Sequence, residues 1–193
     1  MGNTMQANSP VSPARPGWHS YFMSMAYLAA TRSRDESTNI GAVIVTKDNF
    51  VVSTGYNSFP SGIKDDVPDR QKRPQKYFYF EHAERNAILL AANNGVRVNG
   101  CIMYTQGTPC ADCARAIIQS GICKLVTHKD WDTKTKMLET WTENRKAGRE
   151  MLQEHGVELL AWSGPLCMVP LVPVKVRGKP LKFDSCGFLL GVE

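Results

Sequence analysis

The sequence has no long apolar run. No segment approaches the roughly 20 consecutive apolar residues that a transmembrane helix needs. The polar start MGNTMQANSPVSPARPG also lacks the apolar core of a secretory signal peptide. It is a poor myristoylation signal, because Gln6 stands where Ser or Thr is required. We therefore expect a soluble, cytoplasmic protein with no membrane partner.

The sequence also lacks a large excess of one charge. Its 23 Lys and Arg against 18 Asp and Glu give a formal net charge of +5. That balance suits an anionic substrate, but it is too small and too scattered to indicate nucleic-acid binding. Hydrophobic residues make up 42% and charged residues 21% of the 193-residue chain, which is a globular composition. A disordered chain is thereby excluded.

The chain divides into three parts. Residues 1–17 are polar, rich in Ser and Pro and without periodicity, which predicts a disordered tail. Residues 18–163 alternate helical and strand patterns, which predicts one domain. Residues 164–193 contain four prolines and form a C-terminal extension whose structure and role the pattern does not indicate.

The middle part predicts the order α-β-β-α-β-α-β-α-β, a layered α/β fold with five strands. A charged, Pro-containing loop over 58–79 interrupts it, and loops of this length are usually functional or mobile. The expected helices cover about 18–33, 82–95, 109–121 and 135–155, and the expected strands about 41–46, 50–57, 101–107, 123–129 and 157–163.

Two of the expected helices begin with metal-binding side chains. His82 lies at the start of HAERNAILLAANNG, and Cys110 and Cys113 lie at the start of PCADCARAIIQSG. One imidazole and two thiolates are a suitable ligand set for zinc. Cys110 and Cys113 are three residues apart, so both sulfurs face one side of a helical turn. Because no secretion signal is present, free thiols or metal ligands are a better interpretation than disulfides.

Three protein ligands leave a fourth tetrahedral position open, which is typical of a catalytic zinc site. Water in that position would have its pKa lowered toward neutrality and become a nucleophile. Glu84 lies two residues after His82 and could reach that water without binding the metal. A carboxylate there could move the proton of the water to a ring nitrogen and then to a leaving amine.

The paired motifs match the His-x-Glu…Pro-Cys-x-x-Cys signature of zinc-dependent deaminases. With RSRD, NIGAVIV, GYNSFPSG, KYFYFEHAERNAI, GTPCADCARAIIQSGI and HKDWD, residues 21–163 resemble the cytidine deaminase superfamily, and most of all its deoxycytidylate (dCMP) deaminases. The resemblance implies a three-layer α/β/α fold with a five-stranded mixed sheet. It also implies hydrolysis of dCMP to dUMP and ammonia, a source of dTMP precursor, and a homo-oligomer, either a dimer or a hexamer.

The resemblance also implies site residues. It assigns His82, Cys110 and Cys113 to one zinc ion per chain and Glu84 to proton transfer. The implied substrate contacts are Asn57 to a sugar hydroxyl, Arg32 to the 5′-phosphate, Trp131 to the pyrimidine ring, and Ala83 within the motif itself.

The sequence departs from the family pattern in the long loop. Ser58 replaces a glycine of the loop that relatives use for control by dCTP and dTTP. A side chain there limits positive φ, so we expect that control to change. Residues 58–81 contain no Cys or His, which predicts the absence of a second zinc. Glu81 and Arg85 add charge beside the motif, which could alter the substrate.

Three alternatives remain open at this point. The enzyme could deaminate another free nucleotide or nucleoside, because the motif fixes the chemistry and not the ring. It could edit RNA or single-stranded DNA, although Asp65, Asp66 and Asp69 dilute the basic run DRQKRPQK. It could be a non-catalytic zinc-binding regulator, against which the intact Glu84 argues.

Overall fold

The computed structural model describes residues 15–135, 142–167 and 174–192. Its main sheet has five strands in the order β2-β1-β3-β4-β5. β1 is antiparallel to both β2 and β3, whereas β3, β4 and β5 are parallel, so the expected mixed sheet is confirmed. The strands are β1 (Gly41–Val45), β2 (Val51–Tyr56), β3 (Ile102–Thr105), β4 (Lys124–His128) and β5 (Glu158–Trp162).

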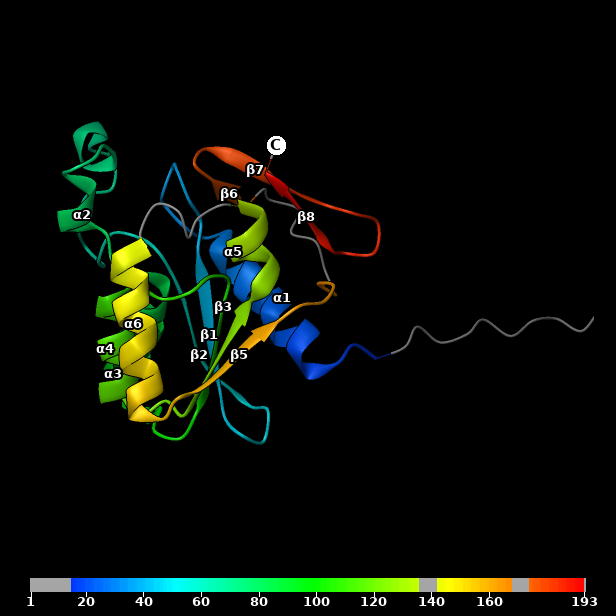
Figure 1. Cartoon of the computed structure of the whole chain (residues 1–193). Helices are drawn as coiled ribbons and strands as arrows, with labels where there is room; N and C mark the ends of the chain where they lie inside the picture. The colour runs from blue at the N-terminus through cyan, green and yellow to red at the C-terminus, as the bar shows by residue number, and fades with distance from the viewer. Residues whose placement is uncertain (1–14, 136–141, 168–173, 193) are drawn as a thin grey trace, which may run out of the picture.

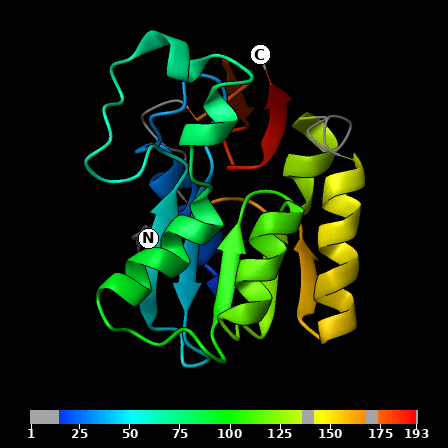
Figure 2. The same cartoon turned by 90° about the vertical axis from the view of Figure 1, so that its left-hand side faces the viewer.

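Helices cover both faces of this sheet, which confirms the three-layer α/β/α architecture. Figures 1 and 2 show one group of helices side by side on one face, and a second group on the other. The first group is α3 (Ala83–Asn93), α4 (Ala111–Gln119) and α6 (Thr142–His155), and the second is α1 (Trp18–Ala30) and α5 (Lys129–Thr135).

The core forms because successive side chains of a strand point to opposite faces. Ala42 and Ile44 of β1 pack in the cluster with α3 and α4. Val43 and Val45 of the same strand pack in the cluster with α1. Both layers are thus needed to bury GAVIV, all five residues of which are buried.

A glycine allows the layer that carries the motif to lie close to the sheet. A Cβ at Gly55 of β2 would lie 2.2 Å from the carbonyl oxygen of Ala83 and 2.4 Å from the amide of Ala87. Both atoms belong to the first turns of α3. The absence of a side chain therefore fixes how closely the start of α3 approaches the sheet.

Two sequence predictions on secondary structure were wrong in part. The region 58–79 is not all loop, because it contains η1 (Pro68–Gln71) and α2 (Lys76–Tyr79). A helix was missed at α5, where Asp130 in the first turn pairs with Lys134 four residues later at 3.0 Å. The predicted helix over 135–155 is described as α6 from Thr142 onward, and its residues 136–141 lie outside the described residues.

The C-terminal extension forms a second sheet. β6 (Lys175–Val176), β7 (Lys179–Phe183) and β8 (Leu189–Val192) are antiparallel in the order β6-β7-β8. Val174 and Val176 are buried in the cluster that also contains α1. The proposed domain boundary at 163/164 stays a prediction. Of the predicted N-terminal tail, residues 1–14 lie outside the described residues.

No helix in the described ranges is long and apolar enough to cross a membrane.

Candidate metal centre and pocket

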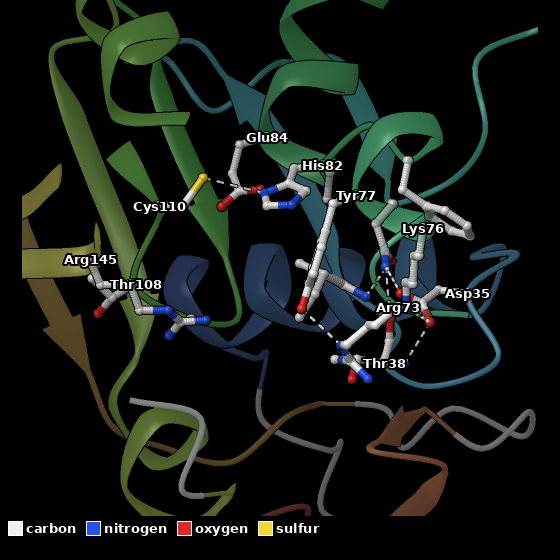
Figure 3. Close-up of a pocket in the computed structure, with 15 residues that line it drawn as sticks. Asp35, Thr38, Arg73, Lys76, Tyr77, His82, Glu84, Thr108, Cys110 and Arg145 are labelled. Atoms are coloured by element: carbon white, nitrogen blue, oxygen red, sulfur yellow. Dashed lines mark hydrogen bonds and ion pairs between the residues drawn. The ribbon is translucent and has the colours of Figure 1, made fainter. Parts of the chain in front are cut away.

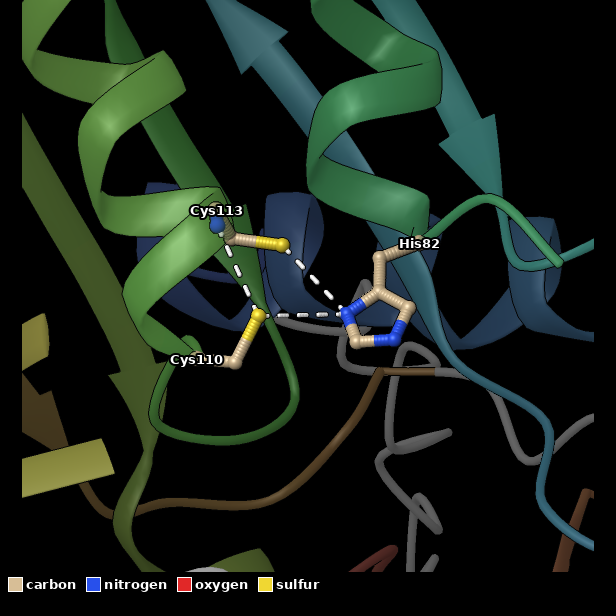
Figure 4. Close-up of side chains that lie close together, drawn as sticks. All are labelled: His82, Cys110 and Cys113. Atoms are coloured by element: carbon tan, nitrogen blue, oxygen red, sulfur yellow. Dashed lines mark hydrogen bonds between the residues drawn. The ribbon is translucent and has the colours of Figure 1, made fainter. Parts of the chain in front are cut away.

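The amino ends of α3 and α4 meet on the same face of the sheet (Figure 4). His82 is the N-cap residue of α3, and Cys110 is the N-cap residue of α4. Cys113 lies in the first turn of α4, where its amide donates to the Cys110 Sγ at 3.5 Å. Free amides and the helix dipole favour a thiolate at this position. The fold therefore brings together the two motifs that are 28 residues apart in the chain.

The spacing of the three side chains fits zinc. His82 Nδ1 lies 3.4 Å from the Cys110 Sγ and 3.4 Å from the Cys113 Sγ. Tetrahedral zinc with ordinary Zn–N and Zn–S bonds holds N and S about 3.6 Å apart. Within the described part of the chain, no fourth His, Cys, Asp or Glu joins this group. One zinc ion with one position open to a small molecule fits the donor set.

Hydrogen bonds among the three side chains shift the pKa of each of them. Hydrogen bonding to Cys113, and then to His82, lowers the pKa of Cys110 to about 3 against the opposing effect of burial. The hydrogen bond to Cys110 raises the pKa of His82 to about 9. The bond to Cys110, together with burial, raises the pKa of Cys113 well above its usual value. The cluster thus carries thiolate character, and a divalent cation would replace its protons.

Glu84 is buried beside this cluster, with 6% of its surface exposed. Figure 3 shows its carboxylate next to His82 and Cys110. Burial raises the pKa of Glu84, while the charges of His82 and Arg145 partly oppose the rise. A raised pKa makes the carboxylate a stronger base for the proton of a water molecule at the cluster.

A pocket opens beside the metal cluster and extends away from it (Figure 3). His82 and Cys110 lie at one end of it, and Arg73 and Lys76 lie at the other. Its walls come from the segment after α1, the region around α2, the loop after β3 and the start of α6. The residues that line it are Asp35, Thr38, Ile40, Asn57, Arg73, Lys76, Tyr77, Phe80, His82, Ala83, Glu84, Gly107, Thr108, Cys110 and Arg145.

Asn57 lines the pocket, yet its amide is fully used within the protein. Its Nδ2 donates to Asp35 Oδ2 at 3.0 Å and to the Thr38 carbonyl at 2.7 Å. Its Oδ1 accepts from the Ile40 amide at 2.7 Å and from the Ser33 hydroxyl at 2.8 Å. Two donors and two acceptor positions are all that an amide side chain offers. Asn57 therefore holds the pocket wall together in this structure.

Two predicted substrate contacts are not brought to the pocket. Arg32 is exposed just after α1 and does not line it. Trp131 is completely buried in α5, behind the loop after β3. A Cβ at Gly107 would lie 2.9 Å from Trp131 Cδ1, so the indole packs directly behind this glycine. Trp131 thus supports the loop and does not offer its face to a ring in the pocket.

The sequence interpretation missed the cations of the pocket. Arg73 and Lys76 come from the charged region 58–79, which was predicted to be a loop, and Arg145 comes from α6. Lys76 is buried and pairs with Asp35 at 2.5 Å. Arg145 pairs with Asp132 at 3.2 Å. The only sequence signal for the first two was the basic run 69–76, which is usually a solvated surface.

α6 also supports the loop between β3 and α4, which carries Cys110. Asn144 Oδ1 accepts the Ala111 amide at 2.8 Å, at the first residue of α4. A Cβ at Gly148 would lie 3.1 Å from the backbone of Cys110, so this glycine allows the close approach. On the other side of the loop, Thr108 donates its hydroxyl to Asp132 at 2.6 Å. The loop that carries Cys110 is therefore held from two directions.

Comparisons with known proteins agree with this geometry. The human deoxycytidylate deaminase is 44% identical over 118 residues, which cover 58% of this chain and 65% of that protein. An uncharacterized deaminase of Aliivibrio fischeri is 38% identical over 74% of this chain and 91% of its own length. The apo structure of the dCMP deaminase of cyanophage S-TIM5 has a TM-score of 0.59 at 25% identity, covering 77% of this chain and all of that one. Since the model of the cytidine and deoxycytidylate deaminase zinc-binding region also matches residues 16–129, the chain belongs to that family.

Proposed function

We propose that this protein is a zinc-dependent deaminase that converts dCMP and water to dUMP and ammonia, and so supplies a precursor of dTMP. One observation carries the proposal. A single pocket joins the His82, Cys110 and Cys113 cluster and the buried carboxylate of Glu84 to two basic side chains, Arg73 and Lys76, at its other end. The metal cluster and Glu84 support hydrolytic deamination, and the basic side chains support a substrate with an anionic group. The chain matches only 65% of the length of the human enzyme. The substrate of that enzyme is therefore only proposed for this chain.

The residues divide the work as follows. His82, Cys110 and Cys113 hold the metal, which supplies a Lewis acid that activates water at neutral pH when it is bound. Glu84 accepts a proton from the attacking water and passes it to the ring N3, and a proton then leaves with the 4-amino group as ammonia. Ala83 is small and lines the pocket, which leaves room for the ring beside the cluster.

Arg73 is the best candidate to bind the 5′-phosphate. Lys76 and Arg145 each have a carboxylate partner, whereas no described carboxylate lies within 4.0 Å of a charged nitrogen of Arg73. Its Nε donates to the Tyr77 hydroxyl at 2.9 Å, which orients the guanidinium at the rim. A guanidinium can meet two phosphate oxygens with parallel hydrogen bonds. Arg32, which the family resemblance suggested for this role, lies outside the pocket.

Kinetics of two arginine variants test the phosphate assignment. Arg73→Ala should raise KM for dCMP about 10- to 100-fold and leave KM for deoxycytidine nearly unchanged, because only dCMP carries the phosphate. Arg32→Ala removes the same charge from an exposed position outside the pocket and should change neither value. Equal effects of Arg73→Ala on both substrates, or a dCMP-specific effect of Arg32→Ala alone, would contradict the assignment.

A deamination panel tests the substrate class. Ammonia release would be followed from dCMP, CMP, deoxycytidine, dCTP, purine nucleotides and a single-stranded oligonucleotide. We expect dCMP to be the preferred substrate. Turnover of another free nucleotide only would keep the chemistry and change the substrate.

Turnover of the oligonucleotide alone would favour an editing enzyme. The region around α2 provides the one observation in its favour. Arg70 lies over the Tyr79 ring at 4.6 Å, and Arg73 lies over the Tyr77 ring at 5.9 Å. Such basic and aromatic pairs occur in sites for single strands.

Assembly, regulation and location remain part of the proposal. We expect a homo-oligomer, to be measured by light scattering, and a cytoplasmic location, to be measured by fractionation. Ser58 forms an isolated bridge with Glu81, with backbone hydrogen bonds of 2.8 and 3.1 Å. Its φ is not positive, so a serine fits the backbone here without strain. Altered control by dCTP or dTTP at this loop stays part of the proposal. Rates measured with and without each nucleotide would decide this.

A further inference from the structure

The turn between β6 and β7 directs two amides toward the segment that follows α1. Arg177 and Gly178 both have positive φ, 52° and 79°, as in the two-residue type I′ turns of hairpins. The Arg177 amide donates to the Thr38 hydroxyl at 3.2 Å. The Gly178 amide donates to the Ser37 carbonyl at 2.6 Å. The turn conformation is therefore tied to its contact with residues 37 and 38.

The strand before this turn continues the contact. The Asn39 amide donates to the Lys175 carbonyl at 2.9 Å. The Lys175 amide donates to Asn39 Oδ1 at 2.8 Å. Four hydrogen bonds thus join residues 37–39 to residues 175–178, which are separated by more than 130 positions in the chain. Backbone groups take part in all four, so the contact fixes the path of the segment.

This segment forms one wall of the pocket. Asp35, Thr38 and Ile40 line the pocket. The Asp35 carboxylate accepts the amides of residues 37 and 38 at 2.7 and 3.0 Å. The same carboxylate pairs with Lys76 and accepts Asn57 Nδ2. The wall is thus held from the pocket side by Asp35 and from the outer side by the hairpin.

The small sheet that the hairpin forms with β8 is attached to the body of the protein. Leu189 is fully buried, and its carbonyl accepts the Lys134 ammonium at 2.5 Å. The Phe183 ring packs edge-on against Tyr27 of α1 at 5.8 Å. Figure 1 shows this small sheet beside the ends of α1 and α5. The apolar attachment holds the hairpin in place, and its turn then holds the wall.

We propose that the β6–β7 hairpin, residues 175–183, is a positioning element of the substrate pocket. It acts through the wall 35–40 and does not itself line the pocket. Through Asp35 it fixes Lys76 and Asn57, whereas the zinc cluster is supported separately by α3, α4 and α6. Its loss should therefore weaken substrate binding more than turnover. Residues 175–183 lie outside the matched family region of 16–129. The choice of dCMP as the ligand rests on the proposed function.

Two glycine variants distinguish the effect of strain in the hairpin turn from the effect of strain in an unrelated turn. Gly178→Ala places a Cβ on a residue with φ +79°. Apart from its chain neighbours, no described residue has an atom within 4 Å of that Cβ, so the change strains the turn without a clash. Gly156→Ala is the matched control, with φ +84° and equally open space, in the turn between α6 and β5. Both are exposed.

We expect Gly178→Ala to raise KM for dCMP by about three- to tenfold and to leave kcat within about twofold. Zinc content should stay unchanged, and hydrogen exchange of the Asn39 amide should accelerate. Gly156→Ala should show none of these changes. An Asn39 amide that exchanges at the wild-type rate in Gly178→Ala would overturn the proposal. So would a KM shift that Gly156→Ala reproduces.

The wild-type protein offers an independent test if Gly178→Ala does not fold. Binding of dCMP should slow exchange of the amides of both 37–39 and 175–178. Protection limited to 37–39 would overturn the proposal. If dCMP neither binds nor reacts, the proposed function fails, and the exchange of Asn39 in Gly178→Ala still decides the role of the hairpin.

Discussion

At the scale of residues, His82, Cys110 and Cys113 lie at the starts of α3 and α4. Short motifs in the sequence mark both helix starts. Pro109 and Gly121 frame α4, and the His82 motif precedes an apolar helical run. The substrate contacts were less predictable. Arg73 and Lys76 reach the pocket only because residues 65–76 fold back on the segment after α1, through Arg34–Asp65 and Lys76–Asp35. No local pattern encodes that contact.

A buried histidine gives a prediction on stability at this scale. His128 is completely buried and lies 2.8 Å from the Tyr27 hydroxyl. Burial lowers its pKa to about 4, with the charge of Asp130 opposing the shift. The unfolded chain, with an ordinary histidine pKa of about 6.5, therefore binds more protons between these two values. The free energy of unfolding should fall as pH drops from about 6.5 to about 4, by up to about 3 kcal/mol.

Urea unfolding at several pH values checks this prediction. His128→Gln replaces the ring by a neutral polar side chain and should remove this part of the slope. At pH 7.5 the variant loses native packing, so its lower stability there is expected and decides nothing. What decides is the difference between wild type and variant, which should shrink on going from pH 7.5 to pH 5. A difference independent of pH would show that His128 is not held neutral.

At the scale of elements, periodicity predicted the five strands and four of the helices that pack on them, α1, α3, α4 and the described part of α6. The strand β1 reads as a continuous apolar run because both of its faces are covered. α5 was missed because its seven residues are too few to show a helical period, and polar residues dominate it. The strands of the C-terminal sheet are two to five residues long, so neither strand alternation nor hydrophobic clustering marks them.

The contact between α6 and α4 gives a prediction at this scale. Asn144→Ala removes the acceptor of the Ala111 amide at the first turn of α4. As for other helix-start contacts, the free energy of unfolding should fall by about 1 kcal/mol. Zinc affinity, measured by competition with a chromogenic chelator, should fall as well, because this turn carries both cysteines. Asn144→Asp keeps the acceptor and should stay near wild type in both measurements. Loss of stability with unchanged zinc affinity would show that α6 does not position the ligands.

At the scale of the whole molecule, each layer has a separate part in the proposed activity. The layer of α3, α4 and α6 carries the zinc cluster and Glu84. The segment after α1 and the region around α2 form the wall and the basic end of the pocket. The C-terminal sheet attaches to α1 and α5 and holds that wall from outside. Such long-range arrangements come from tertiary packing. The sequence therefore predicted the zinc chemistry but not the shape of the pocket.

The most direct test of this account is ammonia release from dCMP by zinc-loaded wild type and by Glu84→Gln, with zinc content measured in both. Gln keeps the size of the side chain and cannot move the proton. We predict that Glu84→Gln keeps one zinc per chain and still binds dCMP, but is slower than wild type by about 10²- to 10⁴-fold or more. Chelation of the metal should abolish the wild-type rate. Comparable rates in the two proteins, or no turnover of dCMP by the zinc-loaded wild type, would contradict the account.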